Sequence, residues 1–243
     1  MFTGKTAVVT GASIGIGRAI ATMLSSNGAS VALIARPGPR LDESTRIVQR
    51  AGGTAVAFPC NLRDPSAVEG AARAIERRFG SPHIIVNCAG VWHDSNVVYA
   101  GKELQDTPIE EIREVFEVTL LGAFLLTRAL LPGILKRRSG KILQISGTFE
   151  SGAAGWLHYY VAKKALEHFS EGLAQELRKH EIQVNTVSPS DTLTEAYRHF
   201  FPDTPKEQCV SPEEIADIAK FLLSDAADHI TGACVAVRSK TAH

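Results

Sequence analysis

A glycine-rich turn close to the N-terminus constrains the fold of this chain more than any other feature. The β-rich run Thr6–Thr10 leads into the sequence GASIGIG, which opens a helix that continues through Leu24. Gly11, Gly15 and Gly17 let the backbone turn sharply and approach a pyrophosphate, whose charge is favoured at a helix N-terminus. A strand, a glycine turn and a helix in this order predict a nucleotide-binding unit.

Strand-like and helix-like segments alternate along the rest of the chain. β-rich runs occupy residues 30–35, 54–59, 83–90, 142–145, 182–189 and 233–237. Helical patterns lie between them, at residues 41–51, 108–135, 159–177 and 211–223 and within 60–80. With 243 residues, 44% of them apolar, the chain fits one domain spanning 1–243. The alternation predicts an α/β fold with a doubly wound parallel sheet, the Rossmann arrangement, and a ligand at the carboxyl ends of the strands.

The net charge and the positions of the cysteines indicate which binding partners and which cellular compartment to expect. Basic and acidic residues both total 26, so no charge excess predicts a nucleic acid or an anionic membrane as a partner. The cysteines, at positions 60, 88, 209 and 234, follow no metal-ligand spacing, so no metal is expected. Reduced thiols and an N-terminus without a basic-then-apolar leader predict a cytoplasmic protein.

The longest apolar stretch also argues against a membrane. Val118–Leu135 is interrupted by Arg128 and Pro132. We expect this stretch to be too short to cross a bilayer and to form a buried helix instead.

A tyrosine and a lysine lie four positions apart in the helical pattern that follows the run ILQI. At this spacing Tyr159 and Lys163 share one helix face, so an ammonium group would favour the ionised phenol. Lowering a phenol pKa from about 10 by roughly 3 units requires about 4 kcal/mol of preferential phenolate stabilisation. Ser146, at the end of ILQI, offers a hydroxyl for a substrate oxygen. These groups suit proton transfer to or from a carbonyl or alcohol oxygen while a hydride moves elsewhere.

The residues alone leave alternatives open for this pair. Tyr160 and Lys164 repeat the same spacing one position later, and the apolar periodicity of the helix does not choose between the two pairs. A tyrosine and a lysine at this spacing also occur by chance on exposed helix faces.

The segment YYVAKKALEHF resembles the active-site helix of the short-chain dehydrogenase/reductase family. Aligned without gaps, the family tyrosine falls on Tyr159 and the family lysine on Lys163. The resemblance implies a carbonyl–alcohol oxidoreductase in which Tyr159 is the general acid/base and Lys163 lowers its pKa and holds the cofactor ribose. For the family serine, spacing favours Ser146 and strand register favours Gly147; we expect Ser146.

Other segments resemble family elements in the same order, from about residue 4 to residue 237. They are T-G-x-x-x-G-x-G at 10–17, N-N-A-G at 87–90 with Cys88 for the second asparagine, and P-G-x-x-x-T at 189–194 with Ser190 for glycine. The resemblance implies cofactor contacts from Gly11, Ser13, Ile14, Gly15, Ile16, Gly17, Asn61, Leu62, Asn87, Ala89, Gly90, Tyr159, Lys163, Pro189, Thr192 and Thr194.

The end of the second predicted strand bears on the choice of cofactor. An acidic residue there would bind the ribose 2′-hydroxyl of NAD, but the chain has Ala35 followed by Arg36. A guanidinium suits a 2′-phosphate, so NADP(H) is preferred and NAD(H) stays an alternative. Against this, Ile14 stands where many NADP-dependent relatives carry a basic residue, and Arg36 could equally be a solvated surface cation.

Four departures from the family pattern define a second hypothesis, the first being Gly147 if it occupies the family serine position. Thr119 replaces the asparagine of V-N-x-x-G, which supports a proton relay, so Thr119 is expected to substitute for it only in part. Ser190 replaces a glycine, and RSK replaces the usual D-G-G near the C-terminus. The alternative function is therefore a catalytically impaired NAD(P)-binding sensor or scaffold of the same fold.

A substrate lid is expected at residues 190–210. Tyr197, Phe200 and Phe201 in this segment suggest an apolar or aromatic small-molecule substrate, although subunit packing explains them equally well. In the family, the 108–135 helix and the Tyr-Lys helix pack against their copies in another subunit, which implies a homodimer or homotetramer.

Overall fold

Seven parallel strands form one sheet in the computed structural model, which describes residues 1–150 and 152–240. The sheet order is β3-β2-β1-β4-β5-β6-β7, so the direction of winding reverses between β1 and β4. A crevice opens at the carboxyl ends of the strands where such a reversal occurs. The strands are β1 Thr6–Thr10, β2 Ser30–Ala35, β3 Ala55–Pro59, β4 Ile84–Asn87, β5 Gly140–Ile145, β6 Ile182–Pro189 and β7 Cys234–Val237. The predicted doubly wound parallel sheet is confirmed.

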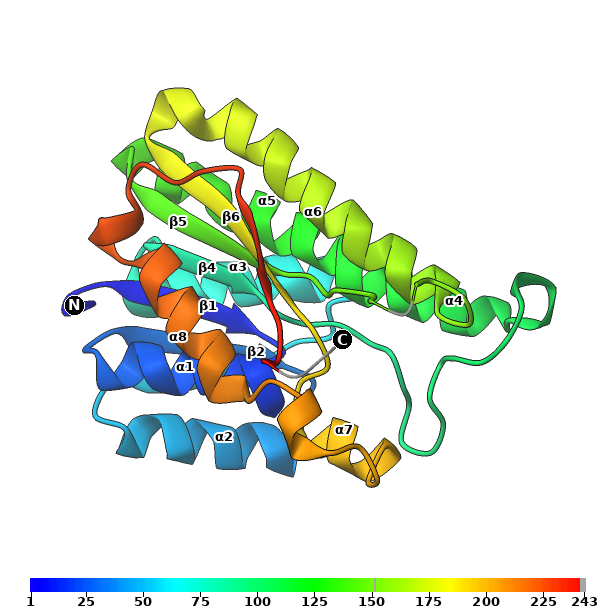
Figure 1. Ribbon diagram of the computed structural model, residues 1–243. Helices are drawn as coiled ribbons and strands as arrows, with labels where there is room; N and C mark the ends of the chain where they lie inside the picture. Colours follow the sequence, from blue (N-terminus) through cyan, green and yellow to red (C-terminus); the bar gives the residue numbers. More distant parts are fainter. Residues whose placement is uncertain (151, 241–243) are drawn as a thin grey trace.

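Helices cover both faces of the sheet (Figure 1). One face carries α1 Gly15–Ser26, α2 Pro39–Arg50 and α8 Pro212–Leu223, and the other carries α3 Pro65–Phe79, α5 Gly122–Arg137 and α6 Leu157–Leu177. Neighbouring strand residues alternate between the two cores, as Val8 and Val9 do. Because both faces are covered, the strands read as nearly continuous apolar runs.

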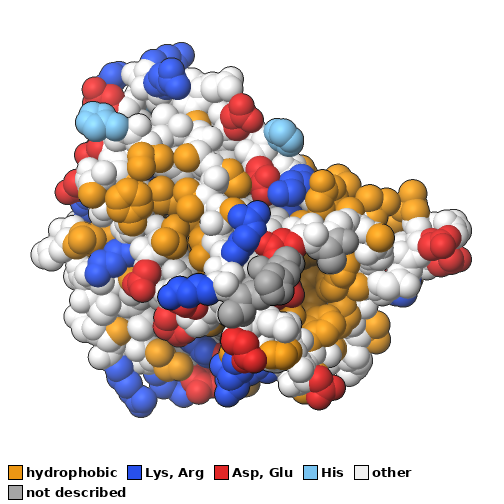
Figure 2. All heavy atoms as spheres, viewed as in Figure 1, with side chains coloured by type: hydrophobic (Ala, Val, Ile, Leu, Met, Phe, Trp, Pro, Cys, Tyr) orange, Lys and Arg blue, Asp and Glu red, His pale blue; other side chains and the backbone are white. Residues whose placement is uncertain are grey.

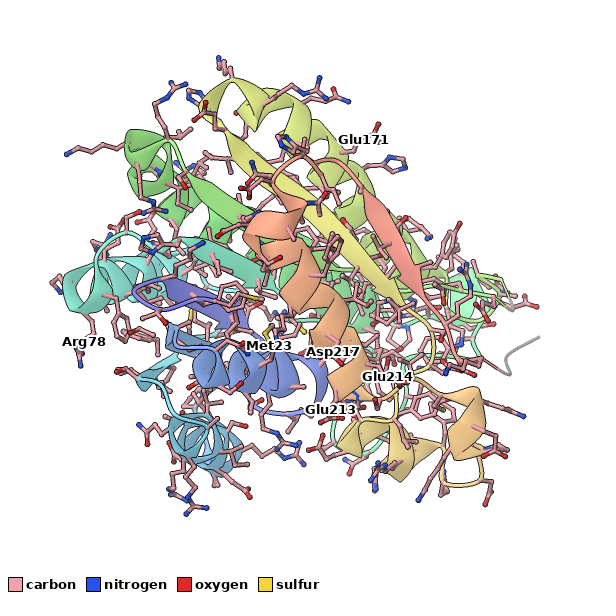
Figure 3. All side chains as sticks on the ribbon, turned by 60° about the vertical axis from the view of Figure 1, so that its left-hand side comes forward. Met23, Arg78, Glu171, Glu213, Glu214 and Asp217 are labelled. Carbon is pink, nitrogen blue, oxygen red and sulfur yellow. The ribbon has the colours of Figure 1, made fainter. Side chains whose placement is uncertain are left out.

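Helices α1 and α8 lie side by side on the first face. Figure 3 shows Met23 of α1 beside Asp217 of α8, and Glu213 and Glu214 in the first turn of α8. The predicted start of α8 is confirmed: Ser211 and Glu214 form a reciprocal capping box that satisfies backbone N–H groups.

A long helix runs without a break from Ile109 to Arg137. It consists of α4 Ile109–Val115, a π-helical turn Phe116–Leu121, and α5. This agrees with the expected helix over residues 108–135, and Pro132 lies inside α5 with an exposed side chain. By length and apolar composition this helix could cross a membrane, contrary to expectation. In this fold it packs on the sheet, with Leu126, Leu130 and Ile134 fully buried.

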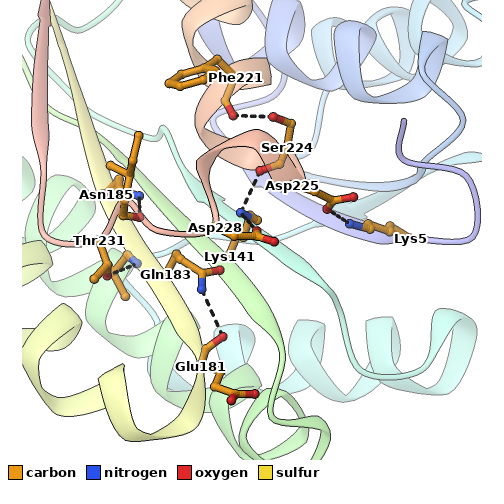
Figure 4. Close-up of polar contacts among 12 residues, drawn as sticks. Lys5, Lys141, Glu181, Gln183, Asn185, Phe221, Ser224, Asp225, Asp228 and Thr231 are labelled. Carbon is orange, nitrogen blue, oxygen red and sulfur yellow. Dashed lines mark hydrogen bonds and ion pairs between the residues drawn. The ribbon is translucent and has the colours of Figure 1, made fainter.

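Lysine side chains anchor the segment that follows α8 (Figure 4). Lys141 of β5 is buried, and its Nζ donates to the carbonyl oxygen of Ser224 at 2.8 Å and to Asp228 Oδ1 at 2.7 Å. Lys5 pairs with Asp225 at 2.9 Å. These contacts lie near the amino ends of β1 and β5, so they stabilise the end of the sheet opposite the crevice.

Candidate active site

The glycine turn packs so tightly that two of its positions require glycine. Gly11 has a φ of +65°, and a Cβ there would lie 2.9 Å from the Cα of Ala89. A Cβ on Gly17 would lie 2.3 Å from the carbonyl oxygen of Gly11. The hydroxyl of Thr10 accepts hydrogen bonds from the backbone N–H groups of Cys88 and Ala89, both at 3.0 Å. The turn after β1 and the loop after β4 therefore form one surface at the switch point.

A carboxylate of the chain itself occupies the anion-binding position at the start of α1. The N–H of Gly15 donates to Glu195 Oε2 at 3.1 Å, and the guanidinium of Arg18 pairs with Oε1. Glu195 begins α7 Glu195–Phe200, which Thr194 caps by accepting from the N–H of Tyr197. Since this carboxylate stands in for a phosphate group, the glycine turn fits the pyrophosphate of a dinucleotide.

A cavity of about 560 Å³ lies beside this contact, between α1, α7 and α8. Its walls include Gly15, Met23, Glu195 and Asp217, but neither Tyr159 nor Lys163. The cavity is therefore separate from the position of this tyrosine–lysine pair.

Tyr159 and Lys163 meet at the carboxyl ends of β4 and β5. The Nζ of Lys163 lies 5.5 Å from the centroid of the Tyr159 ring and donates to the carbonyl oxygen of Ile145 at 2.7 Å. A Cβ on Gly90 would lie 3.2 Å from this Nζ, so the glycine leaves room for the lysine. The pair is thus connected to the glycine turn through the Ala89–Gly90 backbone.

The second tyrosine–lysine pair makes different contacts. Lys164 forms an ion pair with Glu167 at 2.9 Å, and its side chain is 35% exposed. The rings of both tyrosines contact Phe149, with centroid distances of 5.0 Å for Tyr160 and 5.8 Å for Tyr159, so the lysines make the difference. Lys163, by contrast, is only 3% exposed. Only the pair Tyr159 and Lys163 has its lysine buried against the loop after β4.

Burial dominates the protonation of this pair. It lowers the pKa of Lys163 to about 8, although the Cys88 thiol and the Glu167 carboxylate oppose the shift. Burial also raises the pKa of Tyr159, and Cys88 raises it further. We expected Lys163, helped by an oxidised nicotinamide, to lower the phenol pKa; in the chain itself, burial acts in the opposite direction.

Ser146 does not offer its hydroxyl to the crevice. Its Oγ lies 2.9 Å from the carbonyl oxygen of Lys163 and 2.7 Å from Glu167 Oε1, and both are acceptors on α6. Gly147 comes two residues after the end of β5, and a Cβ there would lie 3.7 Å from the Phe149 ring and 3.9 Å from the carbonyl oxygen of Pro189. Both residues therefore lie just beyond β5, with the hydroxyl of Ser146 held against α6.

Thr119 lies where the family asparagine is expected. It is fully buried in the π-helical turn, and its Oγ1 accepts from the N–H of Val91 at 3.3 Å. A Cβ on Gly90 would lie 3.6 Å from this Oγ1, which puts Thr119 next to Lys163. Asn87 has turned away, because its Nδ2 donates to Thr127 Oγ1 of α5 at 2.9 Å.

Arg36, Asn61 and Leu62 are the residues expected near the adenosine end of the cofactor. Arg36 follows β2 with 76% of its side chain exposed, and its Nη1 is 4.0 Å from Glu114 Oε1. Asn61 uses its Oδ1 to accept from a backbone N–H two residues later. Leu62 is buried against Gly122 of α5. Of these three residues, only Arg36 carries a charge, and most of its side chain is exposed to solvent.

The remaining predicted cofactor residues have local roles in the chain. The carbonyl of Ser13 accepts from Ser44 Oγ at 2.7 Å, and Ile14 is the extended residue that precedes α1. Ile16 packs partly against the first core. Pro189 ends β6, and Thr192 donates to the carbonyl oxygen of Ser190 at 2.9 Å.

Aromatic rings from three segments line the substrate side of the crevice. We call Trp92, Trp156, Phe200 and Phe201 the aromatic collar. Trp92 contacts the other three rings at centroid distances of 5.7 to 6.3 Å, and Trp156 contacts Tyr159 at 6.1 Å. Figure 2 shows a hollow with mostly hydrophobic walls where the loop after β4 and α7 face each other in Figure 1.

Sequence reasoning missed three residues of this site: Glu195, Glu167 and Trp156. Glu195 directly follows the family threonine, and Trp156 directly precedes the Tyr-Lys helix, so both had a positional signal. For Glu167 the local pattern indicates only its ion pair with Lys164, because its other partners, Ser146 and Ser188, come from the end of β5 and from β6.

Comparison with known proteins decides the family. Residues 11–239 match the family model described as enoyl-(acyl carrier protein) reductase. The chain is 34% identical over 242 residues to the 3-oxoacyl-(acyl-carrier-protein) reductase FabG of Escherichia coli, covering 95% of this chain and 94% of that protein. The chain belongs to the short-chain dehydrogenase/reductase family. Its members are NAD(P)-dependent oxidoreductases, so the predicted family and enzyme class are confirmed.

Solved structures of short-chain dehydrogenases/reductases share the whole fold. L-sorbose reductase from Gluconobacter frateurii, complexed with NADPH and L-sorbose, superposes with a TM-score of 0.87 at 28% identity, covering 98% of this chain and 96% of that chain. A 7α-hydroxysteroid dehydrogenase complexed with NADH and 7-oxo glycochenodeoxycholic acid gives 0.88 at 26% identity, covering 99% and 95%. Structures similar to this chain thus bind either dinucleotide.

Proposed function

We propose that this chain is an NADP(H)-dependent oxidoreductase that interconverts a carbonyl and an alcohol, with Tyr159 as the general acid/base. The observation that carries the proposal is the Lys163 Nζ held 5.5 Å from the Tyr159 ring, beside the loop that packs on the glycine turn. Bound NADP(H) would supply or accept the hydride.

The residues around the crevice have distinct roles in this proposal. The glycine turn from Gly11 to Gly17 and the N-terminus of α1 bind the pyrophosphate, and Arg36 binds the 2′-phosphate. Lys163 holds the ribose and supplies positive charge near the phenol. Tyr159 donates a proton to the carbonyl oxygen during reduction, a role that its raised pKa suits because the phenol stays protonated. Thr119 supports Lys163 as a partial relay.

Ser146 is assigned to positioning and not to substrate binding. Its hydroxyl is within 2.9 Å of two acceptors on α6, so it fixes the helix that carries Tyr159 and Lys163. A substrate carbonyl would then depend mainly on Tyr159. Ser146→Ala should lower kcat/KM by less than about tenfold, whereas loss of a substrate-oxygen donor costs about 100-fold or more.

The substrate class, the compartment and the subunit number are part of the same proposal. We propose a small-molecule carbonyl or alcohol of apolar or aromatic character as substrate, and a cytoplasmic homodimer or homotetramer without nucleic acid or membrane partners. Leu121, Phe124, Leu157 and Val161 are each more than 40% exposed on the 109–137 helix and α6, which suits packing against a second copy. Light scattering after size-exclusion chromatography tests the subunit number.

The impaired sensor or scaffold stays a second candidate because Gly147 and Thr119 both lack the expected functional group. It predicts dinucleotide binding without hydride transfer. The deciding experiment uses NADPH deuterated at the transferred position with a panel of ketones. Deuterium on the carbinol carbon of a product supports the oxidoreductase, and binding without label in any product supports the sensor.

A further inference from the structure

The aromatic collar gathers rings that lie far apart in the sequence. Trp92 comes from the loop after β4, Trp156 from the loop before α6, and Phe200 and Phe201 from α7 and its C-terminal end. Phe200 and Phe201 both contact Trp92 of the same chain, so packing against a second subunit is not needed to explain why these positions are aromatic. Through Trp156 the collar continues directly to the ring of Tyr159.

The geometry of the collar favours a flat ligand. The rings of Trp92 and Phe201 are nearly parallel, with an interplanar angle of 22° and centroids 6.2 Å apart. Flat rings pack face to face with carbon atoms about 3.5 Å apart, so a planar ligand can follow the orientation that these two rings share. A saturated ring is thicker and fits such faces less closely.

Charge near the collar disfavours an ionic ligand. Among the residues that the structure describes, Lys163 is the one cation that lies over a ring of the collar or of Tyr159. The titratable side chains that contact rings of the collar are His93, beside Trp92 and Phe200, and His199, beside Phe200. Among the described residues no lysine or arginine lies over a ring of the collar itself, so a carboxylate or phosphate on the substrate would meet only these histidines there.

From these observations we infer that the substrate is an uncharged aryl ketone, or the corresponding benzylic alcohol, whose ring stacks in the aromatic collar. This inference rests on the proposed function. In the reduction, the hydride of NADPH adds to the carbonyl carbon, the carbon–oxygen π bond breaks, and the oxygen takes the proton of Tyr159. The products are the benzylic alcohol and NADP⁺, and solvent returns the proton to the phenol.

The test compares acetophenone with cyclohexyl methyl ketone, which differs only in ring saturation, and with 4-acetylbenzoate, which adds a charge. We expect kcat/KM with NADPH to be about tenfold higher for acetophenone than for either other ketone, because its uncharged aromatic ring contacts two rings of the collar. Trp92→Leu should bring the first ratio close to one, and Trp92→Phe should restore it. Phe79→Leu, in the remote ring pair of Phe58 and Phe79, is the control for general destabilisation.

Fluorescence provides a readout that does not need turnover, because Trp92 and Trp156 are the two tryptophans of the chain and both lie in the collar. With NADP⁺ present, acetophenone should change their emission saturably, and cyclohexyl methyl ketone should not. Equal or better turnover of the saturated or charged ketone, unaffected by Trp92→Leu, overturns the inference and leaves the proposed function intact. If no ketone is reduced, either here or in the deuterium experiment with the ketone panel, the proposed function fails, and the emission titration alone decides whether the collar binds aryl rings.

Discussion

Lys163 combines a positive charge with almost complete burial, and this combination sets its chemistry. Burial lowers its pKa from the ordinary 10.5 to about 8, so it is a cation below about pH 8 and neutral above it. The unfolded chain binds the lysine proton up to about pH 10.5, so the free energy of unfolding should rise between these two pH values. The charge therefore costs stability at neutral pH, as expected for a functional group.

The activity should follow the opposite trend. Since the cationic form of Lys163 is needed beside Tyr159, kcat/KM should be retained below about pH 8 and decline as the pH rises through that value. Lys163→Arg keeps its charge, so any activity it retains should decline only at higher pH. A wild-type profile that rises steadily to pH 10, measured by NADPH oxidation, would refute this role of the ammonium.

Arg36 should determine the choice between the two dinucleotides. Arg36→Asp removes the partner of a 2′-phosphate and adds a carboxylate for a 2′-hydroxyl, so the ratio of kcat/KM for NADPH over NADH should fall by about 100-fold or more. Arg46→Asp, an exposed arginine within α2, is the matched control. Unchanged selectivity in Arg36→Asp would make Arg36 a surface cation only.

Local spacing pointed to residues that the fold brings together, and it gave no information where a distant partner decides how a side chain lies. The choice of Tyr159 and Lys163 over the next pair agrees with the burial of Lys163. Ser146 and Gly147 are consecutive residues just after β5, so a shift of one position in the alignment exchanges them. The acceptors on α6 that orient Ser146 belong to another element and leave no trace in the local pattern.

At the scale of elements, α7 is coupled to the glycine turn. The carboxylate of Glu195 binds the N–H of Gly15 and the guanidinium of Arg18, where an anionic ligand would compete with it. Glu195→Gln should therefore lower the NADPH dissociation constant about three- to tenfold, measured by calorimetry. Glu213→Gln, on the wall of the same cavity, should leave it unchanged. Weaker binding in Glu195→Gln would mean that this carboxylate supports the site instead.

The π-helical turn is an element that periodicity did not predict. The segment Phe116–Leu121 is apolar and helix-compatible, so one long α-helix was the expected form. A π turn adds a residue to one helical turn, and such turns often occur at functional sites. Here it contains the buried Thr119, next to Lys163.

At the scale of the whole molecule, the order of strands and helices could be predicted because each element has its own local pattern. Strand runs bounded by glycine turns and helices with caps, such as the Ser211–Glu214 capping box, need no information from elsewhere. Which loop side chains contact one another at the crevice could not be predicted. Contacts such as Trp92 with Phe201 join segments that are far apart in the sequence and meet only after folding.

The stability of the molecule should depend on a lysine far from the crevice. Lys141→Ala removes two hydrogen bonds and leaves the carbonyl of Ser224 without this donor, so the free energy of unfolding should fall by about 2 kcal/mol. The exposed Lys136→Ala should change it by less than about 0.5 kcal/mol in the same denaturant titration. NADPH affinity should stay unchanged in both variants. Equal stability of the two would show that Lys141 contributes nothing.

The most direct test of the account replaces each of the adjacent tyrosines by phenylalanine and measures turnover and NADPH binding together. Tyr159→Phe should lower kcat by about 100-fold or more while the NADPH dissociation constant stays within about twofold, and Tyr160→Phe should keep nearly full activity. Full activity in Tyr159→Phe, or its loss in Tyr160→Phe alone, would contradict the assignment of the general acid/base.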